Sequence, residues 1–282
     1  MRPTVIFVHG VFIWDPDWWW RPVAERLREH GIESRTVQLP STGPAAPLGD
    51  LRDDTAAVRH AIDAVGGPVV LVGHSYGGMV VNEAAAGHPL VSHLVFMSAF
   101  VPDGRCAVRC DFTNPDDMAA FDHEMAGGGP KAWIGSRLLK LRGGAVNALM
   151  LDWMIAGGLR ARIATAVITF MARGGWVTSG EGGTKSHLLV DLPDPELVRG
   201  SLQRLVRQSV ICGVQAPKAA AWREKPSTFI VILNDLDVSV ERQRAHAARC
   251  DQVIELPTNH FAHLERPDLV CDALLQVAGQ GA

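Results

Sequence analysis

The hexapeptide Gly73-His74-Ser75-Tyr76-Gly77-Gly78 is the segment of this sequence with the clearest chemical meaning. It has G-x-S-x-G spacing and lies between an apolar run, residues 69–72, and a stretch with helical spacing. A sharp strand-to-helix turn lifts a serine hydroxyl clear of the sheet and requires glycines where a Cβ would collide with backbone. The flanking elements disfavour an ordinary glycine-rich turn with an incidental serine. We therefore predict that Ser75 is a nucleophile.

Two backbone N–H groups near this turn are candidates for an oxyanion hole. The N–H of Tyr76 would lie at the N-terminus of a helix, where it can meet developing negative charge. The N–H of Val11 follows the first apolar run in His9-Gly10-Val11, and Gly10 would let that loop pass close to the serine. An ordinary turn after a strand is the alternative for this loop. We predict Val11 and Tyr76 as the two donors.

A serine hydroxyl needs a general base, and the base needs an acid that orients it. Asn259-His260 follows the apolar run 253–256, so we prefer His260 to His263 as the base. In hydrolases with this turn the partners follow the serine in the order acid, then histidine. Asp235 and Asp237 both follow the run 228–233, at the sheet edge where open α/β sheets place their sites. The spacing leaves these two open, with Asp103 as a weaker alternative.

Strand-like and helix-like segments alternate in both halves of the chain, which predicts βαβ units and a mostly parallel sheet flanked by helices. The alternation of strands and helices stops between residues 103 and 225, where helix-like segments are separated by glycine clusters. We predict an α/β core made of residues 1–102 and 226–282, with residues 103–225 as an inserted, mainly helical cap. The predicted strands are 4–8, 34–39, 69–72, 94–98, 228–233 and 253–256, and the predicted helices are 18–30, 50–65, 76–86, 241–248 and 267–277.

Composition excludes several classes of partner. With 282 residues, 47% hydrophobic and a net charge of −3, the chain can build one large core and has no basic excess for nucleic acid or an anionic membrane. No apolar stretch approaches the roughly 18–20 residues of a membrane span, and no secretory signal is visible, so we expect a cytoplasmic protein.

The 5 cysteines fit reduced thiols, with a metal site or disulfide at Cys106 and Cys110 as the weaker interpretation. We expect no metal and no organic cofactor, and the sequence leaves a homo-oligomer open.

These motifs resemble the α/β-hydrolases similar to plant hydroxynitrile lyases, plant methyl esterases and bacterial small-ester hydrolases. The resemblance covers both halves of the core and implies the α/β-hydrolase fold. In the pattern of this family the acid aligns with Asp237, so the resemblance selects Asp237 over Asp235. The matching segments are Val8 to Trp20, Gly73 to Gly78, Ser98-Ala99-Phe100-Val101-Pro102, and Asn259-His260 before Leu264-Glu265-Arg266-Pro267.

Departures from the family pattern narrow the expected activity. The lyases have a lysine directly after the catalytic histidine, where this chain has Phe261. They also have a threonine after the first histidine of the pattern, which is His9 here, and this chain has Gly10 at that place. We therefore expect a serine hydrolase that cleaves a carboxylic ester, lactone or thioester of an apolar small molecule through an acyl-enzyme. Aromatic residues near the turn and in the insertion are expected to bind that substrate: Phe12, Trp14, Trp133 and Trp153.

Two other functions fit the same residues. A lyase, cyclase or acyltransferase would use the same triad for a reaction other than hydrolysis. The insertion matches the family pattern poorly, which keeps this alternative open. A ligand-binding receptor on the same fold is less favoured, because candidates for every catalytic role are present.

Overall fold

The computed structural model describes residues 2–103, 176–178, 192 and 194–279. Its centre is a six-stranded sheet in the order β2-β1-β4-β5-β8-β9, and every neighbouring pair is parallel. The strands are β1 (Thr4–Val8), β2 (Ser34–Val37), β4 (Val69–His74), β5 (Val91–Met97), β8 (Ser227–Ile232) and β9 (Gln252–Leu256). The predicted fold class is therefore confirmed.

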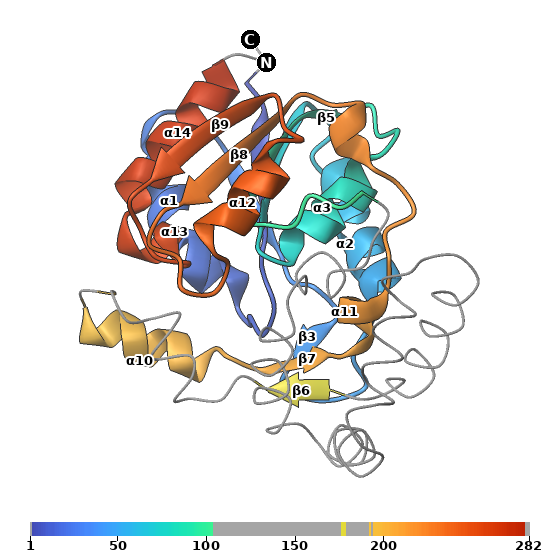
Figure 1. Cartoon of the computed structure of the whole chain (residues 1–282), viewed down its shortest axis with the longest axis vertical. Coiled ribbons are helices and arrows are strands. Elements are labelled where there is room, and N and C mark those ends of the chain that lie inside the picture. Colours follow the sequence, from blue (N-terminus) through green and yellow to red (C-terminus); the bar gives the residue numbers. More distant parts are fainter. Residues whose placement is uncertain (1, 104–175, 179–191, 193, 280–282) are drawn as a thin grey trace.

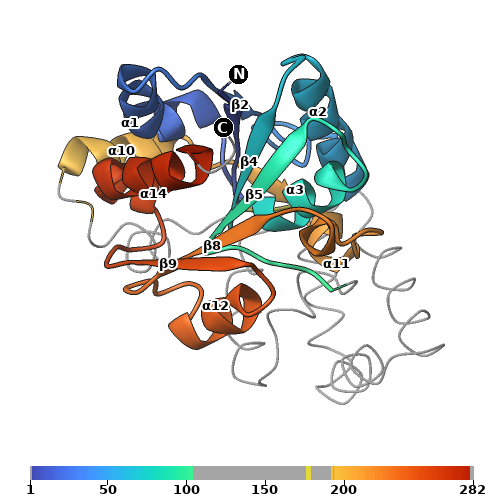
Figure 2. The same ribbon diagram turned by 90° about the horizontal axis from the view of Figure 1, so that it is seen from above.

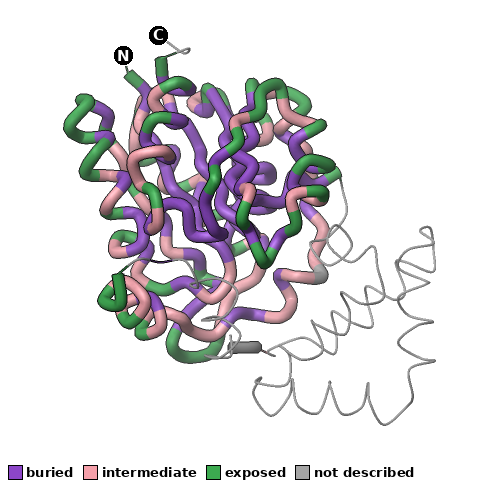
Figure 3. The backbone as a smooth tube through the Cα atoms, turned by 60° about the vertical axis from the view of Figure 1, so that its left-hand side comes forward, coloured by how far each residue is buried: buried purple, intermediate pink, exposed green. Residues whose placement is uncertain are grey.

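Helices cover both faces of this sheet (Figures 1 and 2). One apolar cluster joins alternate strand residues to α2, α3 and α12, and a second joins the other face to α1, α13 and α14. Burial on both faces explains the apolar runs within the central strands β4 and β8, every residue of which is buried. Buried backbone gathers at the centre of the molecule (Figure 3). The helices are α1 (Pro16–Glu29), α2 (Leu51–Asp63), α3 (Gly77–Ala85), α12 (Val240–Ala247), α13 (Ala262–Glu265) and α14 (Pro267–Gly279).

Local sequence fixes where these helices begin. Asp50 caps α2, because its side chain accepts hydrogen bonds from the N–H groups of Arg52 and Asp53, while the side chain of Asp53 accepts one from the N–H of Asp50. Ser239 caps α12 in the same way through the N–H of Arg242. Helix α1 instead begins at a proline, where the missing N–H costs nothing. The observed helix bounds lie within a few residues of the predicted ones.

A second, three-stranded antiparallel sheet was not predicted. It has the order β3-β7-β6, with β3 (Thr42–Gly43) from the core and β7 (Arg207–Ser209) and β6 (Trp176–Thr178) from the predicted insertion. Strands of two or three residues are too short to show an alternating pattern in the sequence. Helices α10 (Pro195–Gln203) and α11 (Ile211–Val214) and a 3₁₀-helix η2 (Ala221–Arg223) complete the described part of this region.

Candidate active site

Ser75 stands in the sharp turn between β4 and α3, with a positive φ of 52°. This conformation is strained for a residue with a Cβ, and it persists because the backbone around it is held on both sides. The N–H of Ser75 donates to the carbonyl of Met97, and its carbonyl accepts from the N–H groups of Gly78 and Phe100. A Cβ on Gly77 would lie only 2.3 Å from the carbonyl oxygen of Val8. The turn therefore needs its glycines, as the sequence predicted.

The loop after β1 lies directly beside the Ser75 side chain. Strands β1 and β4 are neighbours, with Val8 in register with Gly73, so the loops that leave them meet at one edge. A Cβ on Gly10 would lie 3.0 Å from the Cβ and 3.4 Å from the Oγ of Ser75. Among the described residues, the backbone N–H groups of Val11 and Tyr76 donate no hydrogen bond. Oxyanion donors must have N–H groups that are not committed to other acceptors, and the assignment of Val11 and Tyr76 stays a prediction.

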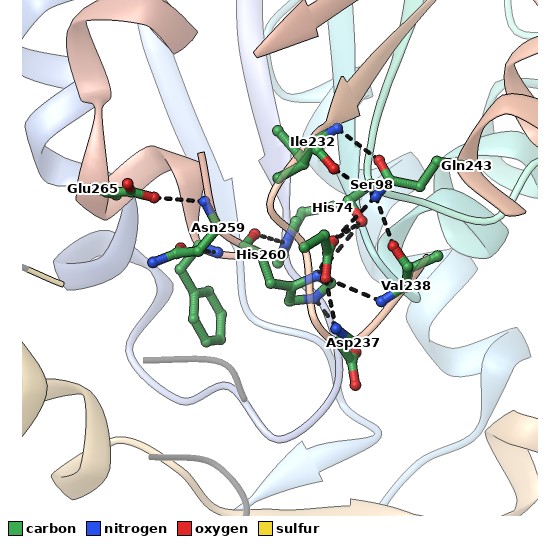
Figure 4. Close-up of polar contacts among 11 residues, drawn as sticks. His74, Ser98, Ile232, Asp237, Val238, Gln243, Asn259, His260 and Glu265 are labelled. Atoms are coloured by element: carbon green, nitrogen blue, oxygen red, sulfur yellow. Dashed lines mark hydrogen bonds and ion pairs between the residues drawn. The ribbon is translucent and has the colours of Figure 1, made fainter. Parts of the chain in front are cut away.

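His260 follows β9 and is paired with Asp235 (Figure 4). Its Nδ1 lies 2.8 Å from Oδ2 of Asp235, and both side chains are almost completely buried. A carboxylate on Nδ1 favours the imidazole tautomer with its proton on Nδ1, in which Nε2 is unprotonated and can accept a proton. This arrangement would orient His260 as a base, as the sequence predicts.

Asp237, the acid expected from the sequence, is not the carboxylate that lies at Nδ1 of His260. The Oδ2 atom of Asp237 lies 3.8 Å from Nε2 of His260, and this side chain is 43% exposed. The reason is the turn after β8: the Oδ1 atom of Asp235 accepts hydrogen bonds from the N–H groups of Asp237 and Val238. This turn keeps the Asp235 carboxylate inside at Nδ1 and directs Asp237 outward, toward the wrong nitrogen for an orienting acid.

Two residues that the sequence analysis did not assign to the site hold Asp235 (Figure 4). The hydroxyl of Ser98, at the end of β5, donates to Oδ2 of Asp235 at 2.5 Å, and Nε2 of Gln243 lies 3.4 Å from the same oxygen. Burial alone would raise the pKa of Asp235, but the charge of His260 and hydrogen bonds from His260, Ser98 and Val238 lower it below the usual value. The position of Ser98 at the carboxyl end of a strand was the signal available in the sequence.

Other histidines around the site are packing residues. His263 is buried and stacked on Trp20, with ring centroids 4.2 Å apart, and burial together with the charge of His260 lowers its pKa to about 3. His74 donates from Nε2 to the carbonyl of His260 at 2.9 Å, and burial lowers its pKa as well. Both rings therefore stay neutral, and of the two candidate bases His260 is the one with a carboxylate partner.

The predicted substrate-binding residues divide into two groups. Phe12 and Trp14 lie in the loop after β1, where Phe12 has a φ of 66° and Trp14 is 40% exposed. Trp133 and Trp153 lie outside the described residues. Asp103, the weaker candidate acid, forms an ion pair with Arg249.

The described residues contain no group of histidine, cysteine and acidic side chains that could hold a metal ion. Cys106 and Cys110 fall outside the described ranges, whereas Cys212 and Cys250 are free thiols whose pKa burial raises to about 12. Such thiols are poor nucleophiles at neutral pH. No helix within the described ranges is long and apolar enough to cross a membrane.

Several known proteins with hydrolase or esterase names are similar to this chain. The chain is 24% identical to the alpha/beta hydrolase nvfD of Aspergillus novofumigatus, over 99% of this chain and 98% of that protein. It is 34% identical to a carbendazim hydrolyzing esterase of a Nocardioides species, over 35% of this chain and 42% of the esterase. Solved structures with the same fold include a pyrethroid hydrolase from Sphingobium faniae (TM-score 0.70, 16% identity, 98% of this chain and 97% of that one). Polyneuridine aldehyde esterase is another (TM-score 0.68, 18% identity, 99% and 100%).

A family model described as the alpha/beta hydrolase family matches residues 5–273, from β1 into α14. This range includes the Ser75 turn, the Asp235 loop and His260. The chain belongs to the alpha/beta hydrolase family.

Proposed function

We propose that the chain hydrolyses a carboxylic ester, lactone or thioester of an apolar small molecule through an acyl-enzyme on Ser75. The observation that carries the proposal is the strained turn at Ser75, with the Gly10 loop against its side chain and an oriented imidazole at the same sheet edge. Family membership and the names of the esterase and hydrolase relatives support an enzyme of the hydrolase class.

In the proposed reaction, Oγ of Ser75 attacks the carbonyl carbon of the substrate while Nε2 of His260 takes the hydroxyl proton. The electron pair of the carbonyl bond moves onto oxygen, where the N–H groups of Val11 and Tyr76 stabilise the negative charge. The intermediate collapses, the leaving alcohol or thiol receives the proton from His260, and Ser75 is left acylated. Water then attacks the acyl carbon in the same way and releases the acid.

Asp235 has the orienting role in this proposal. Its carboxylate holds the Nδ1 proton of His260 and stabilises the imidazolium that forms during each step. Because Ser98 and two backbone N–H groups also donate to Asp235, the carboxylate stays ionised although it is buried.

The test is covalent labelling with a fluorophosphonate, followed by mass-spectrometric mapping of the modified residue. We expect a single adduct on Ser75, absent from Ser75→Ala and retained in Ser92→Ala. Ser92 is a matched control because its hydroxyl only donates to the carbonyl of Val69 at the start of β4. Ser75→Ala should lower esterase turnover by on the order of 10⁶. An adduct on any other residue would overturn the proposal.

A lyase, cyclase or acyltransferase with the same triad is the competing outcome. Turnover in water enriched in ¹⁸O separates the two, because hydrolysis places one ¹⁸O atom in the released acid. A product without the label would reject hydrolysis while keeping Ser75 as the nucleophile.

A further inference from the structure

A buried carboxylate lies close to the nucleophile turn and has no role in the proposed reaction. Asp54, on α2, is completely buried, although burying a charge is costly unless donors compensate for it. The hydroxyl of Tyr76 donates to its Oδ2 at 2.8 Å, and the N–H of Ser41 donates to its Oδ1 at 2.8 Å. Asp54 therefore holds the side chain of the residue that directly follows Ser75.

The hydrogen bonds continue from Ser41 to the other side of the site. Nε2 of Gln208, on β7, donates to Oγ of Ser41 at 3.1 Å, and Oε1 of Gln208 accepts the N–H of Phe12 at 3.3 Å. Gln208 is 4% exposed, and Ser41 and Asp54 are fully buried. The four bonds form one continuous chain from Tyr76 through Asp54, Ser41 and Gln208 to Phe12, which we call the polar arc.

Each end of the polar arc adjoins a proposed oxyanion donor. Tyr76 carries one donor on its own backbone, and Phe12 follows Val11, which carries the other. Main-chain bonds reinforce both attachments: the N–H of Val206 donates to the carbonyl of Phe12 at 2.7 Å, and the N–H of Ser209 donates to the carbonyl of Ser41 at 2.9 Å. The arc thus joins the two halves of the hole through buried groups.

We propose that Asp54, Ser41 and Gln208 are positioning residues that set the separation and direction of the Val11 and Tyr76 N–H groups. This inference rests on the proposed function. Oxyanion donors are effective only when they are held within a few tenths of an ångström of the developing charge, since they must not reorganise during the reaction. Phe12 needs such support because its φ of 66° is strained for a bulky residue.

The ionisation of Asp54 agrees with this role. Burial raises its pKa to about 6, against hydrogen bonds from Ser41 and Tyr76 that lower it. Near neutral pH the carboxylate is charged and accepts from both donors, which strengthens the bonds that fix Tyr76.

The test measures how fast Ser75 reacts with a fluorophosphonate, whose phosphoryl oxygen gains charge in the same hole. We expect Gln208→Ala and Tyr76→Phe each to lower the limiting rate of phosphonylation about 10- to 100-fold, because removing an oxyanion donor outright costs about 10²–10³. The concentration for half-saturation should change less than about threefold. Tyr76→Phe removes only the hydroxyl and keeps the backbone N–H.

Gln215→Ala is the matched control. Gln215 is also a glutamine of the returning chain that bridges a core N–H and a core side chain, since Oε1 accepts from Leu51 and Nε2 donates to Asp50. These bonds lie outside the polar arc. Gln215→Ala should therefore react at the wild-type rate even where its melting temperature falls as far as that of Gln208→Ala.

Each outcome supports or rejects the polar arc. Because Gln208 and Tyr76 act through one arc, the double variant should lose about as much as the worse single variant. Losses that multiply, wild-type rates in folded single variants, or an equal loss in Gln215→Ala would overturn the inference. If Gln208→Ala fails to fold, Tyr76→Phe and Ser41→Ala decide it alone. A wild-type chain that is not labelled at Ser75 would instead reject the proposed function.

Discussion

The carboxylate of Asp235 is surrounded by donors on both oxygens. His260 and Ser98 bind Oδ2, while two backbone N–H groups from its own loop bind Oδ1. Such a carboxylate cannot turn away from the imidazole without breaking several buried hydrogen bonds, so it holds the ring in one orientation. Asp237 has an exposed side chain near the opposite ring nitrogen and provides no comparable restraint.

Asp235→Asn should therefore be the severe variant of the two. An amide at this position favours the wrong imidazole tautomer, and kcat is expected to fall by about 10⁴. Asp237→Asn should retain activity within about tenfold, since it removes only a partly exposed charge. Steady-state kinetics on a p-nitrophenyl ester distinguish them. If Asp237→Asn lost most of its activity and Asp235→Asn lost little, Asp237 would be the acid, as the family pattern implies.

Asp54 gives a pH dependence of stability with a defined sign. Its pKa is about 6 in the folded chain and about 3.9 when unfolded, so the folded state holds the proton more tightly. Its contribution to stability is complete below about pH 4 and is lost as the pH rises to about 6, by on the order of 3 kcal/mol. Urea unfolding across this range should show wild type losing free energy of unfolding relative to Asp54→Asn.

Asp50, on the same helix, supplies the opposite control. Burial alone would raise its pKa, but hydrogen bonds from Gln215, Arg52 and Asp53 hold it below the usual value. Relative to Asp50→Asn, wild type should therefore gain stability as the pH rises from the lowered folded pKa to the pKa of the unfolded chain, and should not change further above it. If the free energy of unfolding depended on pH equally in Asp54→Asn and Asp50→Asn, Asp54 would not be the group that causes the loss of stability.

The first turn of α3 packs against the end of β1 with no space for a side chain. A Cβ on Gly77 would lie 2.3 Å from the carbonyl oxygen of Val8 and 2.8 Å from that of His9. Both are backbone atoms of the segment that leads into the loop after β1. The separation of strand and helix at this point therefore depends on the absence of a single methyl group.

Gly77→Ala should destabilise the chain by on the order of 3 kcal/mol, because backbone must move to admit the new Cβ. Gly279→Ala is the control, since a Cβ there would meet no atom of the described residues within 4 Å. Chemical denaturation compares the two, and the control should change by less than about 0.5 kcal/mol. If the Gly77→Ala protein were as stable as wild type, the backbone of α3 and β1 would be able to move apart here without cost.

Most of the core elements could be predicted because their sequence patterns are strong. The apolar runs at 69–72 and 228–233 identified buried strands, although β5 begins before the predicted residue 94, where Ser92 and His93 interrupt the apolar pattern. Sequence spacing also brought Ser75 and His260 to one edge. It could not choose between Asp235 and Asp237, because that choice depends on how a tight turn directs two side chains only two positions apart.

The polar arc could not be predicted for a different reason. Ser41, Asp54 and Gln208 are far apart in the sequence, and each is an ordinary polar residue when viewed alone. They meet only because β7 pairs with the two-residue strand β3, which has no recognisable sequence pattern. Networks built across such short pairings become visible only in three dimensions.

At the scale of the whole molecule, the site lies at the carboxyl edge of the main sheet. The small β3-β7-β6 sheet is on the same side, and the N-terminus lies at the opposite end (Figure 1). The chain returning from the predicted insertion contacts the loop after β1 through the bridge between Ile13 and Leu205 and the ion pair between Asp15 and Arg204. These contacts join the returning segment to the core.

We predict a preference for bulky apolar or aromatic acyl groups over acetate. Phe12 and Trp14 lie in the loop beside the nucleophile, and Trp133 and Trp153 are expected to contribute from the insertion. Burial of apolar surface contributes about 25 cal/mol per Å², so an added phenyl ring of about 100 Å² should raise kcat/KM at least about tenfold. A series of p-nitrophenyl esters that differ only in the acyl group measures this. A flat series, or one that favours acetate, would contradict it.

The contact between the returning segment and the loop after β1 also limits where a chimera of this protein and a relative can be joined. A chimera in which residues 103–225 were replaced as one segment would lose Arg204 and Gln208 along with the rest of the predicted cap. Phe12 would then lose the partner of its N–H, and the imported segment would have to supply another. A functional chimera should therefore place its second junction before residue 204, so that the strand returning to the core stays with the core it supports.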